Sequence, residues 1–171
     1  MKVTFAEALA KAIYDSLAAD ARVMLIGGGF MGLNPVAQKT MEPVLKDFAV
    51  RISVTPISEL GLAGAGTGAA LAGMRPLVDL STGSFIFQAF PQVVNEAANI
   101  HYMSGGQVSV PVTFYSLAGM RGGGAAQHSH RPQAMLGQAP GLQILMPGGA
   151  EDAYYLMKWA LRESRNPTVF I

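Results

Sequence analysis

The chain has 171 residues, a length that fits one domain with a buried core. Half of its residues are hydrophobic and only 13% are charged, against about 25% in an average domain, so we expect a sizeable interface with another subunit. The formal net charge of +1 and the scattered Lys and Arg residues argue against a nucleic-acid surface. No apolar run reaches the ~18 residues of a membrane span. The absence of cysteine excludes disulfides and thiolate metal sites, and it fits the cytoplasmic location that we expect.

The first half of the chain alternates helical and extended patterns. Thr4 and Glu7 have the spacing of a capping box, and apolar residues recur at helical spacing from Phe5 to Leu17. Residues 22–26 read as a buried strand that the glycines at 27–29 terminate. The pattern then predicts a helix over 36–48, a buried strand over 50–54, a small-residue helix over 64–73 and a strand over 75–80.

The second half continues this alternation and contains one long glycine-rich segment. It predicts a helix over 85–103, strands over 111–115 and 142–146, a helix over 150–162 and a final strand over 168–171. The segment 118–130 reads as a loop of more than ten residues, a length usually associated with function or disorder. The expected fold is α/β, a doubly wound, mainly parallel sheet with helices on both faces. No linker divides residues 1–171, so we expect a single domain.

A glycine motif offers the first candidate site. Residues 27–32 fit G-x-G-x-x-G directly after a predicted strand, as in an NAD-binding Rossmann-like domain. Asn34 and Pro35 favour a turn where that motif needs a helix. The acid expected for the ribose would have to be Glu59, several residues beyond its strand. A glycine fingerprint alone is therefore weak support for a nucleotide site.

Two histidines in the long loop offer the second candidate. His128 and His130 stand two residues apart, but no Asp, Glu or Cys lies near them to complete a metal site. An imidazole titrates near neutral pH, so a proton donor or a stabiliser of negative charge is a stronger interpretation, with solvated loop histidines as the alternative. Ser129 lacks a G-x-S-x-G context and is not predicted to be a nucleophile.

Glu59 is the third candidate, shortly before the predicted small-residue helix. A carboxylate there stabilises a helix dipole by a fraction of a kcal/mol, which is the simplest interpretation. The glycines and alanines that follow leave a surface with few side chains. An acid beside such a surface also suits a flat ligand that must exchange one proton with the protein.

Three segments in this order resemble a known family. They are 55–59 (Thr-Pro-Ile-Ser-Glu), 102–107 (Tyr-Met-Ser-Gly-Gly-Gln) with Val110-Pro111, and 126–129 (Ala-Gln-His-Ser). The chain is similar to the β subunit of the thiamine-diphosphate-dependent decarboxylase component of 2-oxoacid dehydrogenases, of the pyruvate, branched-chain and acetoin types. This family belongs to the transketolase-like superfamily, and the likeness extends from Phe5 to Pro167.

The resemblance implies a cofactor, thiamine diphosphate, and a set of site residues. The family's glutamate hydrogen-bonds the pyrimidine nitrogen opposite the amino group and relays the proton that activates the cofactor for attack on a 2-oxoacid, which is then decarboxylated. Glu59 matches that residue, and His128 matches a histidine that stabilises charged intermediates or helps to pass on the acyl group. The implied set is catalytic Glu59 and His128, cofactor-binding Glu59, Ile57, Phe85 and Gln88, and His130 as a candidate second titrating group, with no metal ligand.

Departures from the family imply a partner. The Gly-Asp-Gly…Asn pattern that holds Mg²⁺ and the diphosphate does not occur here, so an α-like diphosphate-binding subunit must supply it, with an α2β2 heterotetramer expected. The small residues of 61–68 would let this helix approach its counterpart in that subunit. Gly28, Gly29 and Phe30 stand where the family usually carries an acid, and His130 where it often has Gln. The differing stretch 164–166 leads us to predict no potassium ion.

The family usually continues into a second domain beyond the position of Ile171. The chain is then either a fragment or one piece of a split enzyme. We expect a pyrimidine-domain subunit that acts on a 2-oxoacid, decarboxylating it and transferring the acyl unit. The alternatives are a split transketolase-like carboligase or transferase without lipoyl chemistry, a non-catalytic regulatory subunit, and an NAD-binding domain.

Overall fold

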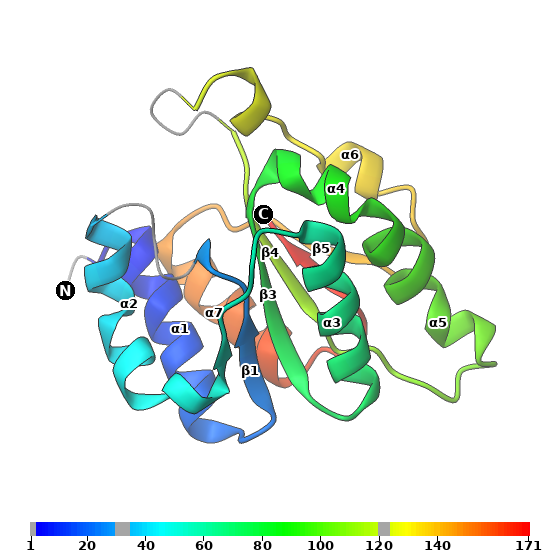
Figure 1. The fold of residues 1–171 in the computed structure, drawn as a ribbon, viewed down its shortest axis with the longest axis horizontal. Coiled ribbons are helices and arrows are strands. Elements are labelled where there is room, and N and C mark those ends of the chain that lie inside the picture. Colours follow the sequence, from blue (N-terminus) through cyan, green and yellow to red (C-terminus); the bar gives the residue numbers. More distant parts are fainter. Residues whose placement is uncertain (1–2, 30–34, 120–123) are drawn as a thin grey trace.

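A computed structural model of the chain describes residues 3–29, 35–119 and 124–171, and it contains one six-stranded sheet (Figure 1). All neighbouring strands pair in parallel, in the order β2-β1-β3-β4-β6-β5. The strands are β1 (Val23–Ile26), β2 (Ile52–Ser53), β3 (Arg75–Thr82), β4 (Thr113–Leu117), β5 (Gln143–Leu145) and β6 (Thr168–Phe170). The predicted parallel α/β sheet is therefore confirmed.

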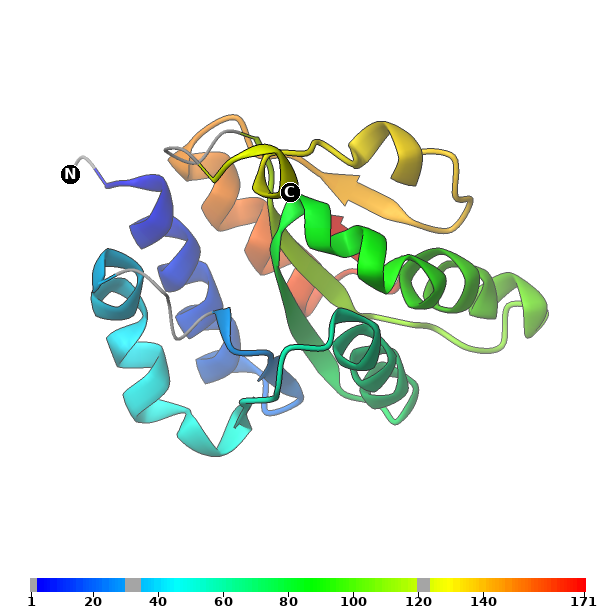
Figure 2. The same ribbon diagram turned by 45° about the horizontal axis from the view of Figure 1, so that its top comes forward.

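Helices cover both faces of the sheet, as Figures 1 and 2 show. One face carries α1 (Phe5–Ala19), α2 (Pro35–Asp47) and α7 (Ala150–Arg162). The other face carries α3 (Glu59–Leu71), the continuous run of α4 (Ile86–Phe90), the π-helical η4 (Pro91–Ala97) and α5 (Ala98–Met103), and the short α6 (Gln133–Leu136). Three 3₁₀ turns, η2 (Ala49–Arg51), η3 (Gly83–Phe85) and η5 (Ala126–His128), complete the described elements. This arrangement confirms the doubly wound fold.

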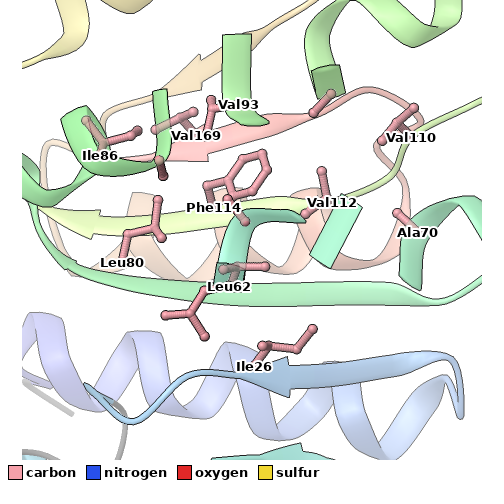
Figure 3. Packing of buried hydrophobic residues seen from close by; sticks show 14 of the residues in the cluster. Ile26, Leu62, Ala70, Leu80, Ile86, Val93, Val110, Val112, Phe114 and Val169 are labelled. Carbon is pink, nitrogen blue, oxygen red and sulfur yellow. The ribbon is translucent and has the colours of Figure 1, made fainter. Parts of the chain in front are cut away.

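Each face of the sheet has its own apolar core, because side chains alternate along a strand. On β3, Leu77 packs with α1, α2 and α7, whereas Val78 and Leu80 point to the layer of α3 and α4. Figure 3 shows the second layer, where the fully buried Phe114 lies among side chains from the strands and from α3 and η4. At about 25 cal/mol per Å² of buried apolar surface, these two layers supply the main stabilisation of the fold.

The two helices with the clearest sequence signals form as predicted. At the start of α1, the Thr4 hydroxyl accepts a hydrogen bond from the Glu7 amide at 3.2 Å, and the Thr4 amide donates to the Glu7 carboxylate at 2.7 Å. These reciprocal bonds satisfy two amides that the helix itself cannot pair. The α7 helix spans the predicted residues 150–162.

The strand predicted over 50–54 is confirmed only at Ile52 and Ser53, and its predicted burial is wrong. Only Ile52 and Ser53 pair, and they pair with β1 alone, at the outer edge of the sheet. Val50 is 98% exposed and Val54 59% exposed, so the apolar run that suggested burial lies on the surface. The following helix also begins at Glu59, ahead of the predicted start at Gly64. Short α6 and the π-helical turn had no recognisable signal. Within the described ranges, no helix is long and apolar enough to cross a membrane.

Candidate functional site

The carboxyl ends of the six parallel strands meet at one edge of the sheet, called the carboxyl edge below. The chain moves outward from β1 to β2 and then returns to β3 on the other side of β1, so the strand order reverses between β1 and β3. Ligands of open α/β sheets bind at such a reversal, beyond the carboxyl ends of the strands. Segment 27–29, the start of α3, η3 and η5 all lie at this edge (Figures 1 and 2).

Glu59 is the first residue of α3 and is half-buried. No hydrogen bond or ion pair to its carboxylate occurs within the described part of the chain. Neighbouring apolar side chains are exposed, with Ile57 at 92%, Val54 at 59% and Leu60 at 47%. A carboxylate at a helix N-terminus is stabilised by the helix dipole, and here it also stands ready to pair with a group from outside.

Two aromatic pairs join η3 and the start of α4 to the segment that contains η5. The ring of Phe85 contacts the ring of His128 edge-to-face, with centroids 5.1 Å apart. The ring of Phe87 contacts His130 in the same way at 5.6 Å. The hydroxyl of Ser84 lies 3.0 Å from Nδ1 of His130. The structure therefore brings Phe85, His128 and His130 together at the carboxyl edge.

Glycines permit this close approach. A Cβ on Gly83 would lie 2.9 Å from the carbonyl oxygen of His130 and 3.2 Å from Cδ of Pro132. A Cβ on Gly124 would lie 2.9 Å from Cβ of His128. Ala125 has a φ of +56°, a left-handed conformation that is uncommon outside glycine. The segment that carries the two histidines is thus folded tightly against η3.

The other predicted site residues lie at the same edge without joining these contacts. Ile57 is exposed just before α3, and Gln88 is exposed on α4, three residues after Phe85 and so on the same side of that helix. Within the described residues, no hydrogen bond or ring contact connects Glu59 to Phe85 or to the two histidines. Any ligand that touches both groups must span α3 and η3.

The glycines of the G-x-G-x-x-G motif pack against a buried acid that sequence reasoning missed. Asp79 is 4% exposed near the end of β3, and one carboxylate oxygen accepts the Ser81 amide at 2.7 Å. A Cβ on Gly29 would lie 2.2 Å from the other oxygen, and Gly27 has a φ of +122°. The sequence feature that could have revealed Asp79 is the presence of an acid inside the mostly apolar run 75–80. Packing against Asp79 explains Gly27 and Gly29 without a nucleotide, while 30–32, the rest of the motif, lies outside the described residues.

The metal and nucleophile interpretations gain no support. Within the described ranges, no group of three His, Cys, Asp or Glu residues is placed to hold a metal ion. The Ser129 hydroxyl donates to the carbonyl of Ala125 at 2.6 Å, so it closes the η5 turn.

A cavity of about 830 Å³ lies elsewhere, between α1 and α2. Its lining includes Lys11 and Asp15, which pair with each other at 2.8 Å, and Tyr14, which donates to Asp47 at 2.9 Å. These polar groups satisfy one another. The cavity contains none of the predicted site residues, so the carboxyl edge is the better candidate.

The fold and this edge define a class: a doubly wound α/β domain that presents a helix-start carboxylate, an aromatic ring and two imidazoles where such sheets bind ligands. The chain belongs to the family described as transketolase, pyrimidine binding domain, which matches over residues 1–171. This confirms the family resemblance that the sequence motifs indicated.

Similar proteins of known name are β subunits of the pyruvate dehydrogenase E1 component. The mitochondrial protein of Pisum sativum is 40% identical over 173 residues, covering 99% of this chain and 47% of its own length. The protein of Rickettsia conorii is 41% identical over 175 residues, covering 100% and 52%. The mitochondrial protein of Bos taurus is 41% identical over 172 residues, covering 100% and 47%. The chain thus spans about half the length of these relatives.

A solved structure described as a split gene transketolase, inactive beta4 tetramer, has a TM-score of 0.77 to this chain. It is 19% identical and is matched over 99% of this chain and 51% of that chain. At this identity the likeness shows the fold alone.

The carboxyl edge carries the kinds of groups that an aminopyrimidine ring needs. Phe85 offers a half-buried aromatic surface, Ile57 an exposed apolar one, and Glu59 a carboxylate that no described group pairs. A flat heteroaromatic ring with a basic nitrogen needs these three kinds of contact: stacking, apolar enclosure and one hydrogen-bonding acid.

Proposed function

We propose that this chain is the pyrimidine-binding part of a thiamine-diphosphate-dependent enzyme that decarboxylates a 2-oxoacid and transfers the acyl unit. The chain is active, on this proposal, only together with a diphosphate-binding subunit. The observation that carries the proposal is the carboxylate of Glu59 at the carboxyl edge, at the start of a helix and without a partner in the described chain. The names of the relatives, β subunits of pyruvate dehydrogenase E1, support the same reaction class.

Five of the predicted site residues have roles that their positions support. Glu59 hydrogen-bonds the pyrimidine nitrogen and shares a proton with it, which no neutral side chain would do as well. Phe85 packs on the pyrimidine ring, Ile57 covers its edge, and Gln88 contacts the cofactor from α4. His128 supplies a hydrogen-bond donor near the reacting carbonyl group. When bound, the thiazolium ring of the cofactor supplies the electron sink for loss of CO2.

A partner subunit completes the site. Val54, Ile57 and Leu60 expose apolar surface directly beside Glu59, where an isolated domain gains nothing from it. The sequence also lacks the motif that holds the diphosphate and Mg²⁺. We propose that an α-like subunit covers this surface and supplies both, in an α2β2 heterotetramer.

Substitution of Glu59 by Gln tests the function. Glutamine keeps the size of the side chain but cannot share a proton in the same way, so turnover by the reconstituted enzyme should fall by about a hundredfold or more. Glu96→Gln, an exposed acid on η4, is the matched control and should retain turnover. Normal turnover of the Glu59→Gln enzyme would refute the mechanism.

Two further measurements separate the alternatives. The proposed enzyme releases CO2 from pyruvate or a branched-chain 2-oxoacid, whereas a split transferase accepts a sugar phosphate in its place, and a regulatory subunit supports neither reaction. An NAD-binding domain would bind NAD without any partner, which calorimetry detects.

The remaining parts of the proposal concern the native chain in the cell. The intact mass of the native protein distinguishes a split subunit of one domain from a fragment of a longer chain. Cell fractionation tests the cytoplasmic location, since some relatives are named as mitochondrial.

A further inference from the structure

The two histidines at the carboxyl edge are held in different ways. His130 has three attachments: its carbonyl accepts the Gly119 amide at 3.4 Å, its Nδ1 lies 3.0 Å from the Ser84 hydroxyl, and its ring contacts Phe87. His128 donates its backbone amide to the carbonyl of Ala125 at 3.3 Å, and its ring makes one contact within the described chain, with Phe85. The two residues each have one backbone hydrogen bond, so they differ in their side chains: the ring with the proposed chemical role has the fewer described contacts.

We propose that Ser84 and His130 form a positioning pair that holds the ring of His128 against Phe85. The two histidines are separated by a single residue, Ser129, whose hydroxyl closes the η5 turn through the carbonyl of Ala125. Fixing His130 therefore fixes where His128 emerges from that turn. This inference rests on the proposed function, because it assigns a purpose to the placement of His128.

The position of Ser84 suits this role. It is 8% exposed and directly precedes Phe85 in η3, so one short turn carries both the anchor for His130 and the ring that His128 contacts. Gly83, the remaining residue of η3, lets the His130 backbone approach, since a Cβ there would meet its carbonyl oxygen at 2.9 Å. A hydroxyl can donate to an unprotonated Nδ1 or accept from a protonated one, so it serves either tautomer of the ring.

Two substitutions of His130 distinguish positioning from direct contact with a ligand. The side-chain amide of Asn reaches the place of Nδ1 and can keep the bond to Ser84, whereas the longer amide of Gln reaches the place of Nε2. Within the described residues, Nε2 of His130 has no hydrogen-bond partner. A positioning pair depends on Nδ1, which lies beside the Ser84 hydroxyl, whereas a ligand contact depends on Nε2.

The test is NMR of the natural chain labelled with ¹³C-histidine. Residues 1–171 contain three histidines, so few ring signals need to be assigned. The Phe85 ring current displaces the His128 ring signals. We expect His130→Asn to preserve that displacement, and His130→Gln and Ser84→Ala to move the signals toward those of exposed His101. Turnover with the partner subunit should fall about ten- to a hundredfold in the latter two variants and remain near the wild-type value in His130→Asn. Ser16→Ala, which removes a hydroxyl inside α1, should leave the His128 signals unchanged.

Unchanged His128 signals in both His130→Gln and Ser84→Ala would overturn the inference. Full turnover in His130→Gln with loss in His130→Asn would also overturn it and would assign His130 to the ligand. The NMR result does not depend on catalysis. Normal turnover of Glu59→Gln would therefore refute the proposed function. The NMR signals of His128 would still decide, separately, whether Ser84 and His130 position its ring.

Discussion

The amino and carboxyl edges of the sheet differ in how far their polar groups are paired within the chain. At the amino edge, where the strands begin, two arginines cap the ends of helices. Arg51 donates to the carbonyls of Leu17 at 2.6 Å and Asp20 at 2.9 Å, at the end of α1. Arg75 donates to the carbonyls of Leu161 and, at 2.6 Å, Ser164 at the end of α7. The carboxyl edge instead exposes Val54, Ile57 and Leu60 around a carboxylate without a described partner.

This difference separates stability from function. The last carbonyls of a helix have no partner within it, and at the amino edge long side chains supply the missing donors. Residues that are fully paired within the chain contribute to folding and are unavailable to a ligand. Groups at the carboxyl edge remain available, at some loss of stability, as expected of a site that another molecule completes. Variants of the two edges should therefore affect different measurements.

Arg75→Met should produce the largest loss of stability. Arg75 is 7% exposed and donates to the carbonyls of Ala160, Leu161 and Ser164, so the substitution leaves three carbonyls without their donor. At about 1 kcal/mol for each bond, the free energy of unfolding should fall by about 3 kcal/mol in urea denaturation. Arg165→Met is the control, because Arg165 is exposed and its side chain donates only to the Ser109 hydroxyl among the described groups. A loss below about 1 kcal/mol for Arg75→Met would contradict this account of the amino edge.

The α3 helix connects the two edges, and its glycines offer an internal comparison. A Cβ on Gly66 would lie 2.2 Å from a methyl of Val78, so Gly66→Ala should lower the free energy of unfolding by about 2 kcal/mol. A Cβ on exposed Gly68 would meet nothing within 4 Å, so Gly68→Ala should raise it by about 0.5–1 kcal/mol. Thermal denaturation of both variants measures this. A loss of stability in Gly68→Ala would contradict the open space that the structure shows beside this glycine.

Phe85→Ala should weaken cofactor binding more than it weakens the fold. Phe85 is half-buried at the carboxyl edge, where its ring contacts His128. An aromatic pair contributes about 0.5–1.5 kcal/mol beyond its buried area, so the affinity of the assembled enzyme for thiamine diphosphate should fall about tenfold. Calorimetry on the reconstituted enzyme measures this affinity. Equal affinity in Phe85→Leu and Phe85→Ala, both reduced, would support a need for the ring itself, whereas unreduced affinity in both would remove Phe85 from the site.

Local patterns predicted what depends on neighbouring residues in the chain. The capping box of Thr4 and Glu7, the bounds of α7 and the alternation of strands and helices were all recovered from the sequence. The burial predicted for the strand over 50–54 was wrong because an apolar run does not reveal whether a strand lies at the centre or the edge of a sheet. Composition predicted an interface with another subunit but did not indicate which surface forms it.

The candidate site was predictable only as separate residues. Motifs indicated Glu59, Phe85 and His128 individually, because each lies in a recognisable segment. The bond between Ser84 and His130 spans 46 positions, and Arg75 reaches carbonyls 85 to 89 positions away. Such pairs depend on the packing of the whole sheet, which spacing in the sequence does not encode. For this reason the amino edge, which has no motif, escaped sequence analysis altogether.

Asp20→Asn should have the smallest effect, and it should depend on pH. Hydrogen bonds from the Arg22 guanidinium lower the pKa of Asp20 to about 2, from an ordinary value of 3.8. Because the folded-state pKa is the lower one, this pair stabilises the folded chain above pH 3.8, and the contribution is lost as the pH falls towards 2. The pair is near the surface, so its contribution at pH 7 should be at most about 1 kcal/mol. Urea denaturation of wild type and Asp20→Asn should differ at pH 7 and converge towards pH 2. Arg22→Met should show the same convergence, and a difference that persists undiminished near pH 2 would mean that the amino edge gains its stability at Asp20 from contacts other than this ion pair.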